Sequence, residues 1–204
     1  MLKSKQPTTK FLHVITIVHG ESELTICEHI ASNLRIKHKD IGEQLGKSSI
    51  QINKLMKFLN SDSRFNTETG FKRTFTDIEK DEKKLIKFKI FIIMDTDDCD
   101  EQTKQNYKTG LMFKGHFLEP YIVPIYNEPN LESTRASIGI IIKDKKEYKK
   151  IFPVNSKGIN LEKIKFFSDK LRKSPNTNME VYVDYCIKIA ESELINPNRN
   201  KLRR

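Results

Sequence analysis

Three short apolar runs rich in β-branched residues stand out from the polar background of the chain, at residues 11–18, 88–94 and 121–126. The first run does not alternate between apolar and polar positions, which is typical of a strand buried on both faces of a parallel sheet. Pro124 lies inside the third run and lacks the N–H group that a ladder hydrogen bond needs. We therefore expect this run at a sheet edge or at a bulge.

Helical spacing of apolar residues begins just after the first run, with Gly20 as the break and Ser22 as the predicted N-cap. Weaker patterns predict a short strand within residues 35–41, a loop at 60–70, a strand at 71–75 and an exposed helix face at 80–87. Further helices are predicted at residues 52–59 (capped by Ser48 or Ser49), 101–113, 131–142, 161–171 and 178–194.

This alternation of strands and helices predicts an α/β fold, with a mostly parallel sheet flanked by helices and a C-terminal helical extension. Residues 1–10 are polar and basic, and we expect a flexible arm there. Residues 11–142 would form the α/β domain, and residues 143–204 its helical extension.

Composition narrows the class of protein. The chain has 204 residues, of which 37% are hydrophobic, so it can bury a core. Its formal charge of +10 favours a polyanionic partner such as nucleic acid. The three cysteines form no CxxC pair, and no apolar run approaches the length of a membrane span. We therefore expect a cytoplasmic protein that does not enter membranes, and its oligomeric state is left open.

The strongest chemical signal is a group of four acids within residues 95–100, directly after the second apolar run. Ligands of open α/β sheets gather at the carboxyl ends of strands. Asp95 and Asp97 have the spacing to aim two carboxylates into one pocket, and hard oxygen ligands suit Mg²⁺ or Mn²⁺. The alternative is an acidic surface turn in which an aspartate caps the next helix.

A second acidic turn follows the first apolar run, where residues 18–23 read VHGESE. If the two strands are neighbours, Glu21 and Glu23 would face the aspartates and complete a carboxylate site, or one of them would act as a general base. Alternatively, both acids only stabilise the first turn of a helix through its dipole. Residues 143–150 carry five lysines, among them Lys143, Lys145 and Lys146, which would either bind phosphates or form a solvated face.

The order of these motifs resembles the Toprim domain of topoisomerases, bacterial primases, OLD nucleases and RloB-like proteins. In that family a strand is followed by Glu-Gly and an acid, and a later strand by Asp-x-Asp. A third stretch, YNEPNLE at residues 126–132, is similar to the Asn-Pro…Glu segment of RloB-like proteins. The resemblance covers roughly residues 11 to 142, and each motif alone is short.

The resemblance implies a Mg²⁺- or Mn²⁺-dependent nuclease of bacterial phage defence that acts on DNA or RNA, with an ATPase as a candidate partner. It implies Asp95, Asp97 and Glu23 as metal ligands, and His19, Glu21 or Glu23 as catalytic residues. One position departs from the family pattern, because His19 stands where the family has glutamate. An imidazole can move a proton or bind a metal, but it supplies no negative charge.

Two other classes of function stay open. His19 is also compatible with an inactive Toprim-like binding or regulatory module that partners an ATPase. A different α/β enzyme using the same Asp-x-Asp for Mg²⁺ would act on nucleotides or small phosphate esters. The chain has no P-loop, and it offers neither a clear catalytic tyrosine nor room for strand passage, which argues against ATP hydrolysis and topoisomerase activity.

Overall fold

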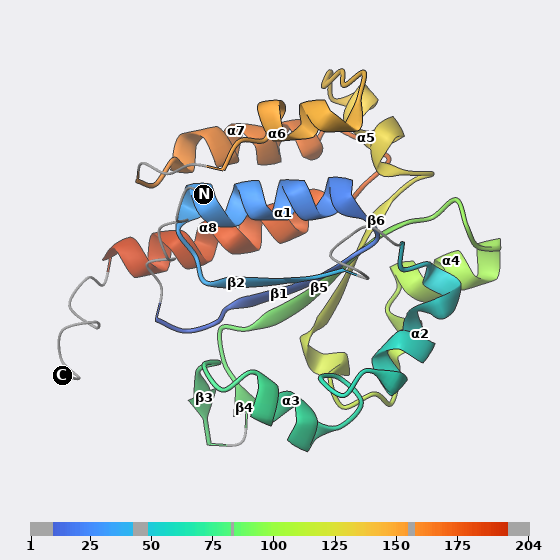
Figure 1. The fold of residues 1–204 in the computed structure, drawn as a ribbon, viewed down its shortest axis with the longest axis vertical. Helices are drawn as coiled ribbons and strands as arrows, with labels where there is room; N and C mark the ends of the chain where they lie inside the picture. Colours follow the sequence, from blue (N-terminus) through green and yellow to red (C-terminus); the bar gives the residue numbers. More distant parts are fainter. Residues whose placement is uncertain (1–9, 43–48, 83, 155–157, 196–204) are drawn as a thin grey trace.

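The computed structural model describes residues 10–42, 49–82, 84–154 and 158–195, and it shows a sheet with helices on both faces (Figure 1). The sheet has four parallel strands in the order β2-β1-β5-β6. These strands are β1 (Val14–Val18), β2 (His38–Ile41), β5 (Lys89–Asp95) and β6 (Ile122–Asn127). The predicted α/β fold with a parallel sheet is confirmed.

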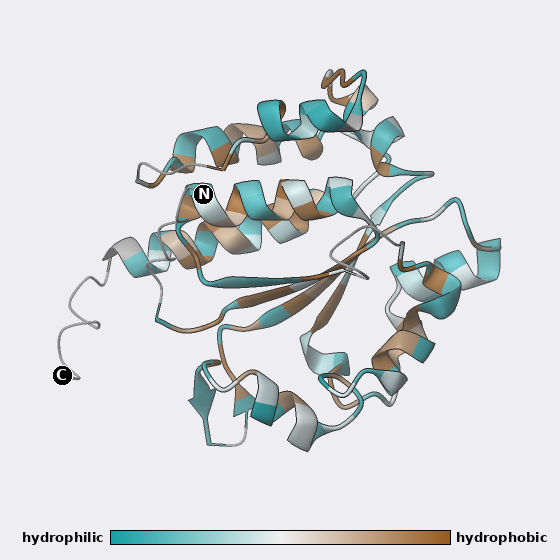
Figure 2. Ribbon diagram, in the orientation of Figure 1, coloured by the Kyte–Doolittle hydropathy of each residue, from teal (hydrophilic) through white to brown (hydrophobic). Residues whose placement is uncertain are grey.

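Each face of the sheet has its own apolar core. One core joins the sheet to α1 (Glu21–Leu34), α6 (Tyr148–Ile151), α7 (Leu161–Leu171) and α8 (Met179–Ile195). The other joins it to α2 (Ile52–Ser61), α3 (Glu68–Thr74), α4 (Glu101–Lys108) and the short turn η2 (Leu111–Phe113). Apolar residues line the strands and the inner sides of these helices, while polar residues face outward (Figure 2).

The two central strands are buried along nearly their whole length because both faces of each are covered. All five residues of β1 are buried, as are six of the seven residues of β5. This burial explains why their sequences are continuous apolar runs. β6 lies at the edge of the sheet, where Pro124 pairs in register with Ile92. The edge position predicted from Pro124 is therefore confirmed.

The predicted strand at residues 71–75 is wrong, because α3 occupies this segment. Thr67 caps the helix by accepting a hydrogen bond from the Gly70 N–H at 3.1 Å. Phe71 and Phe75 are one helical turn apart, and their ring centroids lie 4.9 Å from each other in the core. Residues four positions apart lie on the same side of a helix, so this spacing places both rings in the core. The strand prediction did not take this spacing into account.

The helix expected over the charged run at residues 80–87 is also wrong. The described part of this segment forms an antiparallel pair of short strands, β3 (Lys80–Asp81) and β4 (Lys84–Leu85). Glu82 between them has a φ of 50°, in the left-handed region that tight turns require.

Several predicted helix ends shift by two to five residues. Gly20 occupies the N-cap position of α1 in place of Ser22, and Gln51 that of α2 in place of Ser49, while Ser48 lies outside the described residues. The helix predicted at 101–113 ends at Lys108 before Gly110, whose φ is 78°. Similarly, α5 (Leu131–Ser137) stops before Gly139, whose φ is 74°. Glycine readily adopts these values, which end a helix.

Candidate functional site

The candidate site lies at the edge of the sheet where three neighbouring parallel strands end. In the register of the sheet, Val18 at the end of β1 pairs with Ile93, and Asp95 at the end of β5 pairs with Asn127 at the end of β6. The turns that follow these strands carry the acidic motifs of the sequence. The two strands are neighbours in the sheet, which meets the condition stated for the acidic turns, and these turns therefore lie side by side.

Asp95 is the buried centre of this group, with a relative exposure of 7%. Its Oδ1 accepts a hydrogen bond from the Leu131 N–H at 3.0 Å and a longer one from Asn127 Nδ2 at 3.4 Å. Burial raises the pKa of Asp95 to about 7, and Glu23 is the strongest of the negative charges that add to this rise. The ionised carboxylate is therefore costly in the folded chain unless a positive charge approaches it.

Glu23 reaches the site from the first turn of α1. Its side chain is buried, and its Oε2 accepts a hydrogen bond from the Gly20 N–H at 3.0 Å. This bond closes the N-terminus of the helix, and the helix dipole favours a negative charge there. Glu23 thus stabilises the start of α1, and its charge is also the one that raises the pKa of Asp95 most.

Glu21, the other acid of this turn, is exposed and lines a shallow surface depression together with Tyr148 and Lys149. Its charge is not among those that change the pKa of Asp95 most. The structure therefore brings Glu23, rather than Glu21, to the buried carboxylate.

The aspartates of the turn after β5 have different hydrogen-bond partners. Asp97 is exposed, and its Oδ2 accepts a hydrogen bond from Asn130 Nδ2 at 3.2 Å. Asp100 caps α4, because its Oδ1 accepts a hydrogen bond from the Thr103 N–H at 2.8 Å. The helix-capping interpretation thus holds for Asp100, while Asp95 and Asp97 face the residues that follow β6.

Asp98 points in a different direction, toward the start of α2. Both of its carboxylate oxygens are shielded from solvent, and neither makes a hydrogen bond of standard geometry with the described residues. Burial raises its pKa, whereas a positive charge on His19 and the nearby N–H of Ile52 would oppose the rise. Asp98 was not expected to belong to the site, because its burial depends on the fold of α2 against this turn.

His19, which stands where the Toprim pattern that the motifs resemble has a glutamate, is half-buried, and both its backbone and its ring are held by hydrogen bonds. Its backbone N–H donates to the carbonyl oxygen of Ile93 at 2.9 Å. Its ring Nδ1 lies 3.0 Å from the carbonyl oxygen of Ile50. A charged His19 would lower the pKa of both Asp95 and Asp98, so the ring lies within electrostatic reach of both carboxylates.

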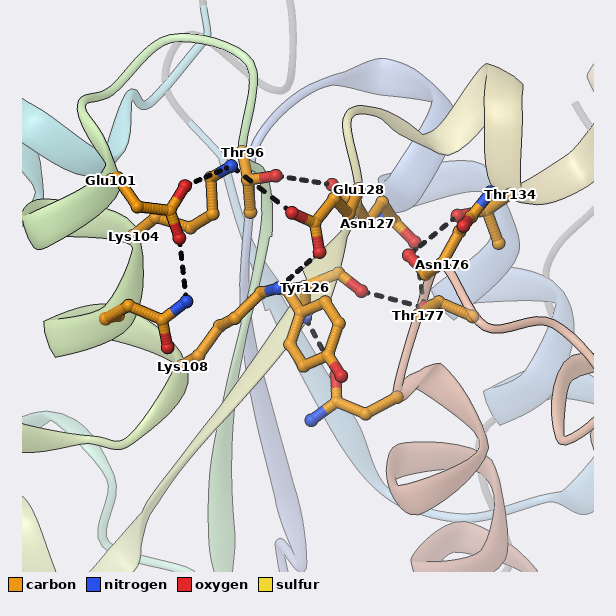
Figure 3. A network of polar contacts seen from close by, with 12 residues as sticks. Thr96, Glu101, Lys104, Lys108, Tyr126, Asn127, Glu128, Thr134, Asn176 and Thr177 are labelled. Atoms are coloured by element: carbon orange, nitrogen blue, oxygen red, sulfur yellow. Dashed lines mark hydrogen bonds and ion pairs between the residues drawn. The ribbon is translucent and has the colours of Figure 1, made fainter.

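The sequence prediction missed Glu132 as a site residue. Glu132 lies in the first turn of α5, directly after β6, and its charge raises the pKa of Asp95. The available signal was the acid within YNEPNLE, in the turn after the third apolar run. The other acid of that stretch, Glu128, forms ion pairs with Lys104 and Lys108 of α4 (Figure 3).

A polar network behind the site holds Asn127 in place. Asn127 is fully buried, and its Oδ1 accepts a hydrogen bond from Thr177 Oγ1 at 3.0 Å. Thr177 Oγ1 also lies 2.8 Å from the carbonyl oxygen of Tyr126, so its single proton is shared between the two acceptors, as Figure 3 shows. The amide of Asn127 is thereby oriented so that its Nδ2 faces Asp95. The segment that leads into α8 thus supports the centre of the site.

The lysine-rich segment lies beside the acidic group. Tyr148 of α6 is buried next to Ser22; burial raises its pKa, and the charges of Glu132 and Glu23 add to the rise. Lys143 and Lys146 are exposed just before this helix, while the side chain of Lys145 lies outside the described residues. The structure therefore places a basic surface near the carboxylates.

The donor atoms are of the right kind for a hard divalent cation, but they are not fully gathered. Within the described residues, no three His, Cys, Asp or Glu side chains lie close enough to form a preformed metal-binding group. Burial and repulsion destabilise the ionised form of Asp95, and the oxygens of Asp98 lack hydrogen bonds of standard geometry within the described residues. A cation nearby would stabilise both carboxylates. Binding would require Glu23 or Asp97 to turn away from its present hydrogen-bond donor.

Comparisons with protein-family models, with curated proteins and with solved structures found no match. In the part of the chain that the structure describes, no helix combines the length and the apolarity that crossing a bilayer requires. The family resemblance therefore rests on the motifs alone, and the function is inferred from the site.

Proposed function

We propose that this chain is a divalent-metal-dependent phosphodiester hydrolase that acts on nucleic acid. One observation carries the proposal: Asp95 is buried where three strand ends meet, and this burial, together with the charges of neighbouring carboxylates, raises its pKa to about 7. A protein keeps such mutually repelling charges at a cost to its stability, and functional sites are where that cost is commonly found. A bound cation would offset the repulsion.

Each residue of the site would have a distinct role in this reaction. Asp95, Asp97 and Glu23 would hold Mg²⁺ or Mn²⁺, with Glu132 as a further carboxylate from α5. When bound, the metal would polarise a phosphoryl oxygen and lower the pKa of an attacking water. Asn127 and the Leu131 N–H fix the position of Asp95 through their hydrogen bonds. His19 is the candidate general base, since its ring lies beside the aspartates.

A polymer substrate is favoured over a free nucleotide by the charge of the chain. The formal charge is +10, and exposed lysines flank the acidic group on the α6 side. Such lysines neutralise backbone phosphates and release counterions, so binding should weaken steeply as salt increases. Lys143, Lys145 and Lys146 would therefore contact the phosphate backbone rather than the scissile phosphate.

The second candidate function is a binding module without catalysis. It is favoured by His19 in place of a glutamate and by the lack of a preformed three-ligand group among the described residues. In that case the carboxylates would bind a cation without turnover, and the basic surface would still bind nucleic acid.

The test is cleavage of plasmid DNA and of total tRNA in Mg²⁺, in Mn²⁺ and in chelator. We expect metal-dependent cleavage that falls by at least about 100-fold in Asp95→Asn and in Glu132→Gln. Glu128→Gln is the matched control, because Glu128 belongs to the same turn but pairs with lysines of α4. It should retain cleavage.

Cleavage in chelator, or cleavage equally strong in Asp95→Asn, would refute the proposal. If no substrate is cut but calorimetry detects metal binding that Asp95→Asn abolishes, the binding module is the correct function. Free nucleotides should be run in parallel, because their hydrolysis without polynucleotide cleavage would identify a small-molecule phosphatase instead.

A further inference from the structure

We propose that the outer surface of α6 and α7 is a docking site for another protein, and that it binds an amphipathic helix with acidic residues beside its apolar ones. The proposal does not depend on the proposed function, because none of the residues involved belongs to the strand-end site. They are called the α6–α7 surface and comprise Ile151, Val154, Ile159, Lys163, Phe166 and Lys170.

Exposed apolar side chains are concentrated in this part of the chain. Among the described residues, seven large apolar side chains are exposed, and four of them lie within residues 151–166. Phe166 is the most exposed of these four, at 64%, followed by Val154 at 55%. Figure 1 shows α6 and α7 outside α1, as the layer of this face that lies farthest from the sheet. Single exposed apolar residues are ordinary, but a group of them marks an interaction site.

Asn33 of α1 holds the two parts of this surface together. Its Nδ2 donates to the carbonyl oxygen of Pro153 at 3.3 Å, and its own carbonyl oxygen accepts from the Asn160 N–H at 2.8 Å. Val154 follows the first of these partners in the chain, and Ile159 precedes the second. The exposed apolar residues at the end of α6 and before α7 are therefore held close to the same residue.

One side of α7 carries basic and apolar residues in alternation. Lys163, Phe166 and Lys170 follow one another at intervals of three and four residues, so they lie on the same side of the helix. The ammonium group of Lys170 lies 5.2 Å from the centre of the Phe166 ring. The inner side of α7 packs against α6, where the rings of Phe152 and Phe167 are 5.5 Å apart. The exposed side is therefore presented by a helix that its buried side holds in place.

The lysines of this surface lack acidic partners. Within the described residues Lys163 and Lys170 form no ion pair, whereas Lys165 and Arg172, on the α8 side of the same helix, pair with acids at 3.0 and 2.6 Å. The basic residues in the last turn of α6 add to the positive charge. A second copy of a chain with a formal charge of +10 would be repelled here. Charge complementarity therefore favours a partner that supplies carboxylates.

Other classes of partner fit this surface less well. A phosphate backbone would pair with the lysines but leave the three aliphatic side chains without a partner. A bilayer would take up the Phe166 ring only together with the ammonium groups of Lys163 and Lys170, which lie on the same side of α7 rather than around it. An acidic amphipathic helix suits both kinds of residue, because its apolar side chains recur every three or four positions with carboxylates beside them.

The experiment uses the full chain labelled with ¹⁵N and a synthetic peptide of about 18 residues, with leucine at every third or fourth position and glutamate beside each leucine. A second peptide has lysine in place of every glutamate. We expect the glutamate peptide to shift the amide resonances of residues 151–170 and to bind at least about 10-fold more tightly than the lysine peptide. Its affinity should fall as salt is added.

Variants of the chain test which side chains bind the peptide. Phe166→Ser should weaken binding by at least about 10-fold, because exposed aromatic residues anchor such interfaces. Lys163→Glu/Lys170→Glu should reverse the preference, so that the lysine peptide binds more tightly. The matched controls are Val181→Ser and Lys188→Glu, which change an exposed apolar residue and an exposed lysine of α8 that lie two turns apart. Both should bind as the native chain does, and circular dichroism would verify that each variant is folded.

Three results would overturn the proposal. The first is an affinity that stays the same in Phe166→Ser, or a peptide preference that survives the charge reversal. The second is failure of the folded native chain to bind the glutamate peptide. The third comes from vesicles of phosphatidylcholine and phosphatidylglycerol and from a single-stranded oligonucleotide, titrated in parallel. If either shifts the resonances of residues 151–170 at a lower concentration than the glutamate peptide does, the surface binds a membrane or nucleic acid instead.

Discussion

Replacing Asp95 by asparagine should stabilise the metal-free protein at alkaline pH. Asparagine keeps an oxygen that can accept the Leu131 N–H, as Asp95 Oδ1 does at 3.0 Å, but it carries no charge. The buried negative charge disappears, and so does its repulsion by Glu23 and Glu132. A residue kept for function at the expense of stability behaves in this way.

The magnitude follows from the pKa of Asp95, which is about 7 in the folded chain against an ordinary value of 3.8. A carboxyl with a raised pKa contributes stability that is fully present below pH 3.8 and is lost as the pH rises through 7. One pKa unit corresponds to about 1.4 kcal/mol. Because the rise is shared with neighbouring carboxylates, we expect Asp95→Asn to gain roughly 2–4 kcal/mol at pH 8. At pH 5 the gain should be less than half of this.

The assay is urea unfolding in chelator at pH 5 and at pH 8, for the native chain and for Asp95→Asn. Asp100→Asn is the control, because hydrogen bonds to Thr103 lower the pKa of Asp100, the opposite direction. That variant should show no gain at pH 8. An Asp95→Asn variant that is equally or less stable than the native chain at pH 8 would refute the electrostatic picture of the site.

Two further substitutions test the framework that holds the site. Tyr107→Phe should lose roughly 1–3 kcal/mol of unfolding free energy, because the buried hydroxyl lies 2.7 Å from the Ile92 oxygen and 2.8 Å from the Ile125 oxygen and so bridges β5 and β6. A loss below about 0.5 kcal/mol in urea unfolding would contradict this role. Gly70→Ala should lose roughly 1–3 kcal/mol, since an added Cβ would lie 2.4 Å from the Ser63 carbonyl oxygen at the start of α3. An unchanged melting temperature for Gly70→Ala would show that this backbone yields more easily than a packed core does.

The sheet was predictable from the sequence because its central strands are buried on both faces. Such strands must be apolar along their whole length, and the runs at 11–18 and 88–94 meet that requirement. Parallel strands place their carboxyl ends at one edge, so the closeness of Glu23 and Asp95 also followed from the motifs. The strand prediction at residues 71–75 was wrong because two phenylalanines four positions apart lie on one face of a short strand as well as of a helix.

The remaining features of the site depend on contacts between distant parts of the chain. The tautomer of His19 is fixed by the Ile50 carbonyl, which belongs to a segment that gives no sequence signal of that role. Asp98 is shielded because the turn after β5 packs against the start of α2, and a row of aspartates in the sequence does not reveal which one is buried. Glu132 joins the group only because β6 pairs with β5, which sets where α5 begins.

The dependence of Asn127 on Thr177 has a consequence for the timing of the protein's synthesis. During translation β1, β5 and β6, with all their acidic turns, leave the ribosome before the segment that begins α8. Until Thr177 follows, the amide that faces Asp95 lacks the hydrogen bond that orients it. The site is therefore completed only late in translation. Nascent chains that still lack α8 carry the carboxylates but not the hydrogen bond that orients Asn127 toward Asp95.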